Sequence, residues 1–275
     1  MCYDDAVKAI VIGAGRGSRL GHLTDEIPKT LVPILGRPML DGILEALAAG
    51  GLRPPDVVFV CGYLAETIRA RYPALDYVEN PGWERNNVLA SLLCAREHMA
   101  GGFVSTYADI VYRPAVIEAL VRSPHDLTVV CDTAWRRRYE GRSQHPETDA
   151  EKLRAEGPRV VEMSRRIAPE LASGEFIGVM KASPAGAARL VRAFDAARDV
   201  FAAHDGGDPQ TPGPAGQLFR EGRTFERAYL IDLLELMLER GELIHRVDTD
   251  GGYMEIDTLE DVSLAESWWS ASARG

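Results

Sequence analysis

The sequence predicts an α/β fold with a mostly parallel β-sheet, and three observations lead to this prediction. Short apolar runs of strand length recur along the chain. Stretches with helical periodicity separate these runs, and strands that alternate with helices are typical of parallel strands joined by crossover helices. The chain has 275 residues, of which 46% are hydrophobic, so it can also bury a substantial core.

The predicted elements alternate regularly from the N-terminus. Apolar runs predict the strands, and a period of 3.6 residues predicts the helices. Strands are predicted at residues 9–14, 56–62, 75–80, 101–110, 126–132, 159–163, 175–182 and 243–248. Helices are predicted at residues 38–49, from 65, from 86, from 114, at 184–204, at 225–240 and after a cap at Thr258.

The alternation loosens after residue 132. Residues near 133–157 are polar, and we expect this insert to lie at one edge of the sheet on the substrate side. The stretch near 205–217 is rich in Gly and Pro and is predicted to be a mobile loop. No internal repeat and no convincing domain boundary is found, so we expect one domain over 1–275.

Charge and composition exclude several classes of function. The formal charge is −10, from 41 acidic against 31 basic residues, whereas nucleic-acid binding needs clustered positive surface. No apolar segment is long enough to span a bilayer, and residues 1–8 are acidic where a secretory signal would be basic. The four cysteines have neither metal-ligand spacing nor the density of a disulfide scaffold, so we expect reduced, mostly buried thiols. The expectation is a cytoplasmic protein with no nucleic-acid or membrane partner.

A glycine-rich turn follows the first predicted strand. Its spacing is Gly13-x-Gly15-x-Gly17-x-Arg19, and glycines let backbone amides approach phosphate oxygens closely. The third glycine comes one position too early for the dinucleotide fingerprint, and no lysine followed by Ser or Thr closes the turn as in a P-loop. The glycines alone are equally consistent with a simple tight turn beside a solvent-exposed Arg19 and Lys29.

The longer stretch at residues 13–40 resembles the signature of the sugar-phosphate nucleotidylyltransferase superfamily. In that family a Gly-x-Gly-x-Arg-Leu loop is followed by Pro-Lys and then by Gly-x-Pro-Met/Leu. The residues that match are Gly15, Gly17, Arg19, Leu20, Leu23, Thr24, Pro28, Lys29, Leu31, Pro33, Gly36, Pro38 and Leu40. Gly13 stands where relatives more usually have alanine, a departure that we expect to cost little.

This resemblance implies both a fold and a set of site residues. The fold is a three-layer α/β/α, Rossmann-like nucleotidyltransferase fold with a mixed, mostly parallel sheet. The turn and Arg19 are expected to bind the triphosphate, and Lys29 the α-phosphate, where charge develops during transfer. The nucleotide-binding residues implied are Gly13, Ala14, Gly15, Arg16, Gly17, Ser18, Arg19, Asn86 and Asn87.

Asp109 and Asp257 are the expected ligands of one magnesium ion. The resemblance implies this pair, because the family places one aspartate after a central strand and another late in the chain. Carboxylates at strand ends are natural ligands for Mg²⁺, which offsets repulsion between the reacting anions. Many relatives carry a second acid where this chain has Tyr107, and Glu255 is a lower-ranked supporting acid. Singly, each aspartate could be a turn residue or a helix-terminal charge. None of the six histidines shows paired metal-ligand spacing.

Further segments resemble cytidylyltransferases that act on phosphocholine or phosphonates. They are residues 86–99, 131–142, 149–153, 173–179 and 225–238. Aromatic faces and a carboxylate both attract an ammonium group, and a lysine could neutralise the acceptor phosphate or phosphonate. The expected acceptor-binding residues are Trp135, Tyr139, Lys152, Glu175, Tyr229 and Asp232. The alternative is that the aromatic residues belong to the core and that the charged ones lie at the surface.

These observations lead to three hypotheses. The first is a magnesium-dependent cytidylyltransferase that joins CMP from CTP to a small phosphorylated alcohol or phosphonate, with Arg19, Lys29, Asp109 and Asp257 as catalytic residues. The second is a nucleotidylyltransferase that uses UTP, dTTP or CTP and a sugar or inositol phosphate. The third is a nucleotide-binding subunit without turnover. The sequence leaves a homodimer open.

Overall fold

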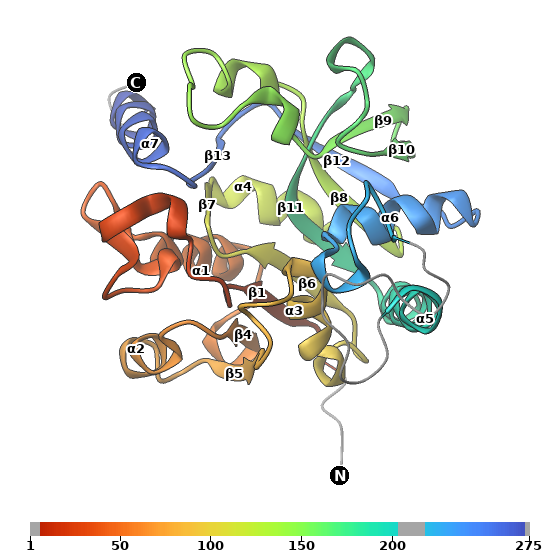
Figure 1. The fold of residues 1–275 in the computed structure, drawn as a ribbon, viewed down its shortest axis with the longest axis horizontal. Helices are drawn as coiled ribbons and strands as arrows, with labels where there is room; N and C mark the ends of the chain where they lie inside the picture. The colour runs from red at the N-terminus through yellow and green to blue at the C-terminus, as the bar shows by residue number, and fades with distance from the viewer. Residues whose placement is uncertain (1–5, 203–217, 273–275) are drawn as a thin grey trace.

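The computed structural model describes residues 6–202 and 218–272, whose arrangement is drawn in Figure 1. The predicted mobile loop near 205–217 lies outside the described residues. The strands are β1 (Lys8–Ile12), β2 (Pro33–Ile34), β3 (Arg37–Pro38), β4 (Val57–Cys61), β5 (Asp76–Glu79), β6 (Phe103–Tyr107), β7 (Ile110–Tyr112), β8 (Leu127–Asp132), β9 (Lys152–Glu156), β10 (Arg159–Met163), β11 (Gly174–Ala182), β12 (His245–Thr249) and β13 (Tyr253–Glu255). The α-helices are α1 (Met39–Ala49), α2 (Ala65–Arg71), α3 (Val88–Cys94), α4 (Pro114–Val121), α5 (Pro184–Phe201), α6 (Leu230–Glu239) and α7 (Leu259–Ser272).

A nine-stranded sheet forms the centre of the described chain, in the order β5-β4-β1-β6-β11-β8-β12-β10-β9. β1 pairs in parallel with β4 and β6, β4 with β5, and β8 with β12. β11 runs antiparallel between β6 and β8, and β10 runs antiparallel to β12 and β9. Because only β10 and β11 oppose the common direction, the sheet is mixed and mostly parallel, as predicted.

Helices cover both faces of the sheet, and β1 shows why. Successive side chains of a strand alternate between the faces, so Ile10 and Ile12 enter one hydrophobic cluster while Ala9 and Val11 enter another. The first cluster contains side chains of α3, α5 and α6, and the second those of α1, α2 and α4. The predicted three-layer α/β/α architecture is therefore confirmed (Figure 1).

The sheet edge formed by β9 was not predicted. Its sequence KLRAE contains one large apolar residue, Leu153, so a search for apolar runs does not detect it. β9 pairs with β10 and, at its beginning, also with β11. The polar insert expected near 133–157 therefore ends in a strand at the edge of the sheet order.

The last two helices begin at capping residues. α6 begins at Leu230 rather than at Phe225, because Asp232 accepts a hydrogen bond from the backbone N–H of Tyr229 at 2.7 Å and fixes the first turn there. α7 begins after Thr258, as predicted. Thr258 Oγ1 accepts a bond from the N–H of Asp261 at 3.3 Å, and Asp261 accepts one from the N–H of Thr258 at 2.9 Å, which is a capping box.

Two expectations from composition can be compared with the structure over the described residues. Within residues 6–202 and 218–272, no helix combines the length and the apolar character needed to cross a membrane. Cys61 and Cys131 are buried free thiols and Cys94 is a partly buried one, as expected. Cys2 lies outside the described residues.

Candidate active site

The glycine turn and Asp109 meet because their strands are neighbours. β1 and β6 are adjacent and parallel, and the carboxyl ends of parallel strands lie at one edge of a sheet. The backbone N–H of Ala108 donates to the carbonyl of Ile12 at 3.1 Å and so joins the two segments directly. The loops after β1 and β6 therefore form one continuous surface.

Two glycines of the turn are required by the side chains that pack against them. Gly17 has a φ of 70°, in the left-handed region, and a Cβ there would lie 2.5 Å from Cδ of Lys29. At Gly13, a Cβ would lie 2.4 Å from the ring of Phe59. The glycine at position 13 is therefore fitted to Phe59 in this chain. Gly15, in contrast, faces open space, which leaves its backbone accessible.

A two-stranded sheet brings the second predicted metal ligand to the first. β7 follows Asp109, and β13 precedes Asp257. The two strands pair antiparallel, and the N–H of Ile256 donates to the carbonyl of Asp109 at 2.9 Å. Asp261, in the first turn of α7, accepts a bond from the N–H of Asp257 at 2.9 Å. The two aspartates, far apart in sequence, are therefore fixed beside each other.

Lys29 lies between these carboxylates. Its ammonium group donates to Oδ2 of Asp109 at 2.7 Å and also to Oδ1 of Asp257. Arg19 donates to Oδ2 of Asp257 at 2.6 Å. The Lys29 side chain is 10% exposed, whereas that of Arg19 is 54% exposed. The structure therefore joins all four residues predicted to be catalytic into one ion-paired group, with Arg19 on its solvent side.

Burial and pairing oppose each other in this group. Burial disfavours the charged form of Lys29, but Asp109 and Asp257 outweigh it and raise the pKa of the ammonium group. Burial would raise the pKa of Asp257, whereas Lys29 and Arg19 hold it below its usual range. For Glu255, burial and then the charges of Asp257 and Asp109 raise the pKa well above its usual value. The site thus contains one more acid than its cations readily neutralise.

The carboxylates fit a magnesium ion. Oδ1 of Asp109 is buried and accepts no hydrogen bond, so an oxygen of a pocket-lining carboxylate is left without a partner. Ligand atoms of Glu255, Asp257 and His145 lie within 4.8 Å of one another, and Asp109 lies outside this group of three. Hard oxygen donors of this kind are the ligands that Mg²⁺ prefers.

His145 lies beside the acids, although the sequence assigned no role to it. A guanidinium nitrogen of Arg142 lies 2.7 Å from Nδ1 of His145. Because a guanidinium group can only donate, Nδ1 accepts this hydrogen bond, and Nε2 carries the proton of the neutral ring. Nε2 lies 3.5 Å from a carboxylate oxygen of Glu255. Arg142 also pairs with Asp261 at 2.6 Å. These contacts anchor the polar insert to the start of α7 and place it over the acids.

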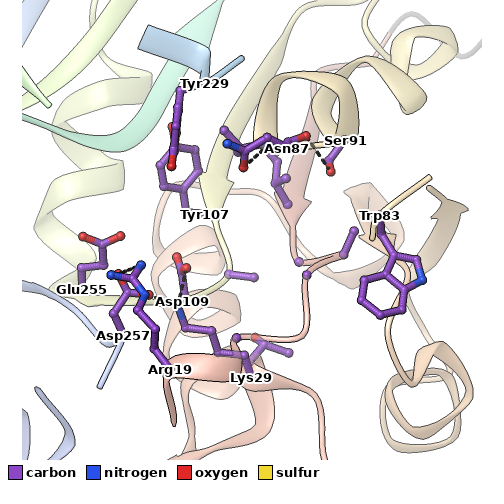
Figure 2. A pocket seen from close by; sticks show the side chains of 18 of the residues that line it. Arg19, Lys29, Trp83, Asn87, Ser91, Tyr107, Asp109, Tyr229, Glu255 and Asp257 are labelled. Carbon is purple, nitrogen blue, oxygen red and sulfur yellow. Dashed lines mark hydrogen bonds and ion pairs between the residues drawn. The ribbon is translucent and has the colours of Figure 1, made fainter. Parts of the chain in front are cut away.

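A pocket of about 650 Å³ lies in front of the ion-paired group. Figure 2 shows Trp83 at one end of this pocket and Glu255, Asp257 and Arg19 at the other. Among the residues predicted to bind the nucleotide, those that line it are Gly13, Ala14, Gly15, Gly17, Ser18, Arg19, Asn86 and Asn87. We call the part around the glycine turn, Lys29 and Asp109 the donor end.

Arg16, Asn86 and Asn87 have structural contacts of their own. Arg16 does not line the pocket, because it pairs with Asp25 at 2.9 Å on the exposed surface. The amide group of Asn86 donates to Asn80 at 2.9 Å. Asn87 caps α3 by accepting a bond from the N–H of Val88 at 2.9 Å. The two asparagines therefore shape the pocket wall whether or not they contact a ligand.

Trp135, Tyr139 and Glu175 do not line the pocket, contrary to the expectation that they bind the acceptor. Glu175 is buried and pairs with Arg138, and it accepts a bond from the Tyr139 hydroxyl at 2.9 Å. Arg138 also pairs with Asp132 at 2.9 Å. Trp135 is buried edge-on against Tyr139. Their polar groups are used within the fold, where they attach the insert to β8 and β11.

Tyr229 lines the pocket, but Asp232 does not. The guanidinium carbons of Arg165 and Arg223 lie 3.9 Å and 4.7 Å from the centre of the Tyr229 ring. Asp232 is buried, caps α6 and pairs with Arg223 at 3.3 Å. The chain's own arginines therefore occupy the aromatic face and the carboxylate that were expected to receive a cationic head group.

Lys152 does not reach the pocket, whereas its neighbour Glu151 does. Lys152 is 2% exposed, donates to the carbonyl of Ala150 at 3.3 Å, and has its pKa lowered by burial. Successive side chains point in opposite directions in extended chain, so the two residues face opposite sides. Glu151 accepts hydrogen bonds from Arg165 at 3.2 Å and from the Tyr107 hydroxyl at 3.4 Å.

Several pocket residues were not predicted as site residues. Tyr107 was considered only as a missing acid; its ring fits because Gly178, with a φ of 76°, lies against it. Trp83 precedes the predicted asparagine pair in a Pro-Gly turn, and an aromatic residue there was the one available signal. The residues that sequence reasoning missed are Ile12, Thr30, Trp83, Val88, Ser91, Tyr107, Ala108, His145, Asp149, Glu151, Arg165 and Arg227. We call the part lined by Tyr107, Glu151, Arg165, Arg227 and Tyr229 the acceptor end.

Comparison with known proteins places the chain among nucleotidyltransferases. Residues 9–206 match the family described as MobA-like NTP transferase domain. CTP:phosphoglutamine cytidylyltransferase of Campylobacter jejuni is 25% identical over 269 residues, which cover 94% of this chain and 98% of that protein. CMP-5'-(3-aminopropyl)phosphonate synthase of Streptomyces rubellomurinus is 39% identical over 124 residues, which cover 43% of this chain and 19% of that protein.

Solved structures agree with this assignment at the level of the fold. The structure of CTP:phosphocholine cytidylyltransferase from Streptococcus pneumoniae matches with a TM-score of 0.66 and 20% identity, covering 96% of this chain and 99% of that one. The resemblance to nucleotidyltransferases inferred from the sequence, and the Rossmann-like fold that it implied, are thereby confirmed. The chain belongs to the family of MobA-like NTP transferase domains, and the protein is a nucleotidyltransferase.

Proposed function

We propose that the protein is a magnesium-dependent cytidylyltransferase that transfers CMP from CTP to a small phosphorylated alcohol or phosphonate and releases pyrophosphate. The observation that carries this proposal is the ion-paired group of Arg19, Lys29, Asp109 and Asp257 beside the glycine turn. A pocket of about 650 Å³ is large enough for a nucleotide and a small acceptor. The names of the relatives support CTP as the donor and phosphorylated or phosphonate compounds as acceptors.

Catalysis by this group consists of positioning and charge stabilisation. The backbone amides of the turn and the exposed Arg19 bind the β- and γ-phosphates, because these donors are fixed in place before the ligand arrives. Lys29 contacts the α-phosphate, where negative charge grows as the transition state forms. Its long stem is held by the backbone of Gly17, so the ammonium group is already oriented.

The acceptor needs no general base. One of its phosphate or phosphonate oxygens is ionised at neutral pH and attacks the α-phosphorus in line. A new P–O bond forms while the bond to the β-phosphate oxygen breaks, and pyrophosphate leaves with the electron pair. No covalent enzyme intermediate forms.

Asp109 and Asp257 would hold the magnesium ion, with Glu255 as a neighbouring acid. When bound, the ion offsets the repulsion between the anionic reactants and the leaving group. The acids are oriented by other residues of the chain, because Asp261 and the β7–β13 pairing hold Asp257 in place and His145 faces Glu255.

A coupled assay tests the proposal. The protein is incubated with Mg²⁺, one of CTP, UTP, dTTP or ATP, and one of phosphocholine, 2-aminoethylphosphonate, 3-aminopropylphosphonate, glucose 1-phosphate or inositol 1-phosphate. Pyrophosphate and the acceptor linked to the donor's nucleoside monophosphate are measured. We expect CTP to be the best donor, a phosphonate or phosphorylated alcohol to be used, and EDTA to abolish turnover.

A pair of aspartate variants separates the metal ligand from the total charge. Asp109→Asn is expected to lose both activity and the Mg²⁺ titration, whereas Asp76→Asn, at an exposed position of β5, is expected to keep both. Preference for UTP and glucose 1-phosphate would support the sugar-phosphate alternative. No pyrophosphate from any donor and acceptor pair would support a subunit without turnover.

A further inference from the structure

Arg165 presents unused hydrogen-bond donors at the acceptor end. Its guanidinium group lies over the ring of Tyr229 and donates to Glu151 at 3.2 Å. Its Nε is buried without a hydrogen-bond partner and is not accessible, whereas the side chain as a whole is 20% exposed and its accessible end lines the pocket. A guanidinium group has five donors in a fixed fork that matches a carboxylate. Arg165 is therefore held in place with donors left for a ligand.

Arg227 adds a second positive charge to the same pocket wall. No carboxylate within residues 6–202 and 218–272 lies at ion-pair distance from its guanidinium group. The carbonyl of Arg227 accepts a hydrogen bond from the side-chain amide of Asn87 at 3.2 Å, which fixes its backbone. A pocket-lining cation that no acid of the described residues neutralises can bind an anion.

The negative charges of the pocket lie mainly at the other end. Asp149 and Glu255 act on Arg19, together with Asp257 and Asp109. At the acceptor end the paired acid is Glu151, and burial, partly offset by Arg165, raises its pKa to about 7. The charge of Glu255 acts on Arg165 as well, with a smaller effect. Glu151 is therefore partly protonated near neutral pH and cannot fully neutralise the two arginines.

A cationic head group would meet an unfavourable surface here. The ring of Tyr229 already lies under two guanidinium groups, and Asp232 is paired with Arg223. Trp135 and Tyr139 are packed outside the pocket. A quaternary ammonium group would thus lie close to like charges, which disfavours binding.

We propose that the acceptor carries a carboxylate in addition to the phosphate or phosphonate that attacks, and that Arg165 and Arg227 bind this carboxylate. The inference rests on the proposed function, because it treats the acceptor end as the place of the second substrate. It makes the enzyme selective for acceptors with an anionic tail over acceptors with an ammonium tail. Arg165 supplies the flat, two-point contact, and Arg227 adds a charge that no acid among residues 6–202 and 218–272 pairs with.

Binding measurements test this inference without relying on turnover. The acceptors are 3-phosphonopropionate, 3-aminopropylphosphonate and phosphocholine, and the first two differ mainly in the charge of the tail. Titration calorimetry is done with Mg²⁺ and a CTP analogue whose α–β bridge is a methylene group, so that no reaction occurs. We expect 3-phosphonopropionate to bind at least about tenfold more tightly than the other two.

Arginine variants locate the contact. Arg165→Met is expected to weaken binding of 3-phosphonopropionate about 10- to 100-fold and to change binding of 3-aminopropylphosphonate less than about threefold. Arg166→Met is the matched control, because the neighbouring side chain is 66% exposed and lies outside the pocket lining. If Arg165→Met does not fold, Arg227→Met gives the same comparison and leaves no carboxylate of the described fold without its partner.

Two results would overturn the inference. One is equal or tighter binding of phosphocholine by the unchanged protein. The other is an equal loss for both phosphonates in Arg165→Met, which would mean that Arg165 binds the attacking phosphonate. Turnover of CTP with each acceptor is measured separately: the expected binding pattern without any pyrophosphate would reject the proposed function alone, whereas preferred turnover of phosphocholine would reject this inference alone.

Discussion

The donor end and the acceptor end of the pocket balance their charges in different ways. At the donor end, the ammonium group of Lys29 lies between Asp109 and Asp257, and Arg19 pairs with Asp257 as well. At the acceptor end, Arg165 pairs with Glu151 and feels the charge of Glu255 more weakly, and Arg227 forms no ion pair with an acid among the described residues. The donor-end cations are saturated, while those at the acceptor end are not.

This difference determines how each end can bind an anion. A triphosphate that arrives at the donor end must compete with two carboxylates for Lys29, unless a metal ion takes over those carboxylates. The donor end is therefore suited to a nucleotide and Mg²⁺ together. The acceptor end can bind an anion directly, because the acids paired with its arginines do not neutralise all of their positive charge. Substitutions at and behind each end test this difference in charge balance.

The largest effect on stability is expected behind the acceptor end, at the buried pair of Glu175 and Arg138. Glu175→Gln leaves Arg138 buried with Asp132 as its remaining partner, and the free energy of unfolding should fall by about 3 kcal/mol. The KM for the acceptor should stay unchanged in the folded variant, because Glu175 does not line the pocket. Urea unfolding and steady-state kinetics measure the two quantities.

Glu162→Gln is the control for this substitution. Glu162 pairs with Arg154 at 2.9 Å, but the two side chains are about half exposed, so the loss should be at most about 1 kcal/mol. If Glu175→Gln raises the KM for the acceptor without changing stability, Glu175 contributes to acceptor binding and not to the fold.

The contrast also explains which parts of the molecule could be predicted from sequence. The donor end follows from a contiguous motif and from the rule that carboxyl ends of parallel strands meet, and the structure brings the predicted Lys29 and Asp109 together there. The acceptor end depends on which way a side chain points, and Glu151 and Lys152 differ by one position. His145 depends on partners more than a hundred residues away, for which the sequence has no local signal.

In the fold, too, the elements with a local apolar pattern were predicted, and those without one were not. Strands buried on both faces, such as β1 and β4, are continuous apolar runs and were predicted. The edge strand β9 has polar residues and was missed. The start of α6 depends on the side chain of Asp232, which apolar periodicity does not register.

Lys29 provides the main test of the donor end. Lys29→Met should lower kcat about 10²- to 10³-fold and weaken CTP binding much less, because the charge that it stabilises grows in the transition state. Single-turnover kinetics and calorimetry separate the two effects. Lys8→Met is the control, because Lys8 lies at the start of β1, outside the pocket lining, and its ammonium group donates to the carbonyl of Pro55. A normal kcat in Lys29→Met would remove Lys29 from the chemistry.

Substitution of Gly13 tests whether packing against Phe59 requires a glycine at the donor end. Gly13→Ala should lower the free energy of unfolding by about 1 to 3 kcal/mol, because the added methyl group would overlap the Phe59 ring. Gly15→Ala, whose Cβ would meet nothing within 4 Å, is the matched control for stability without nucleotide. If both variants unfold at the same urea concentration as the unchanged protein, Phe59 moves aside freely, and the glycine at position 13 has no packing role.

Glu151 tests the charge balance at the acceptor end through pH. Its pKa is raised from 4.5 to about 7, so between these values the folded protein binds a proton that the unfolded chain has lost. Glu151 therefore lowers stability progressively as pH rises from about 4.5 to 7. In Glu151→Gln this dependence is absent, and the stability of the variant relative to the unchanged protein should rise by about 1 to 3 kcal/mol between about pH 5 and pH 8.

Thermal unfolding across this pH range measures the difference, with Glu156→Gln at an exposed position of β9 as the control. The comparison uses the change with pH, because loss of the bond to Arg165 adds an offset at every pH. A difference that stays constant from pH 5 to pH 8 would mean that Glu151 is ionised throughout. It would then neutralise Arg165, and the acceptor end would be as saturated with acid as the donor end.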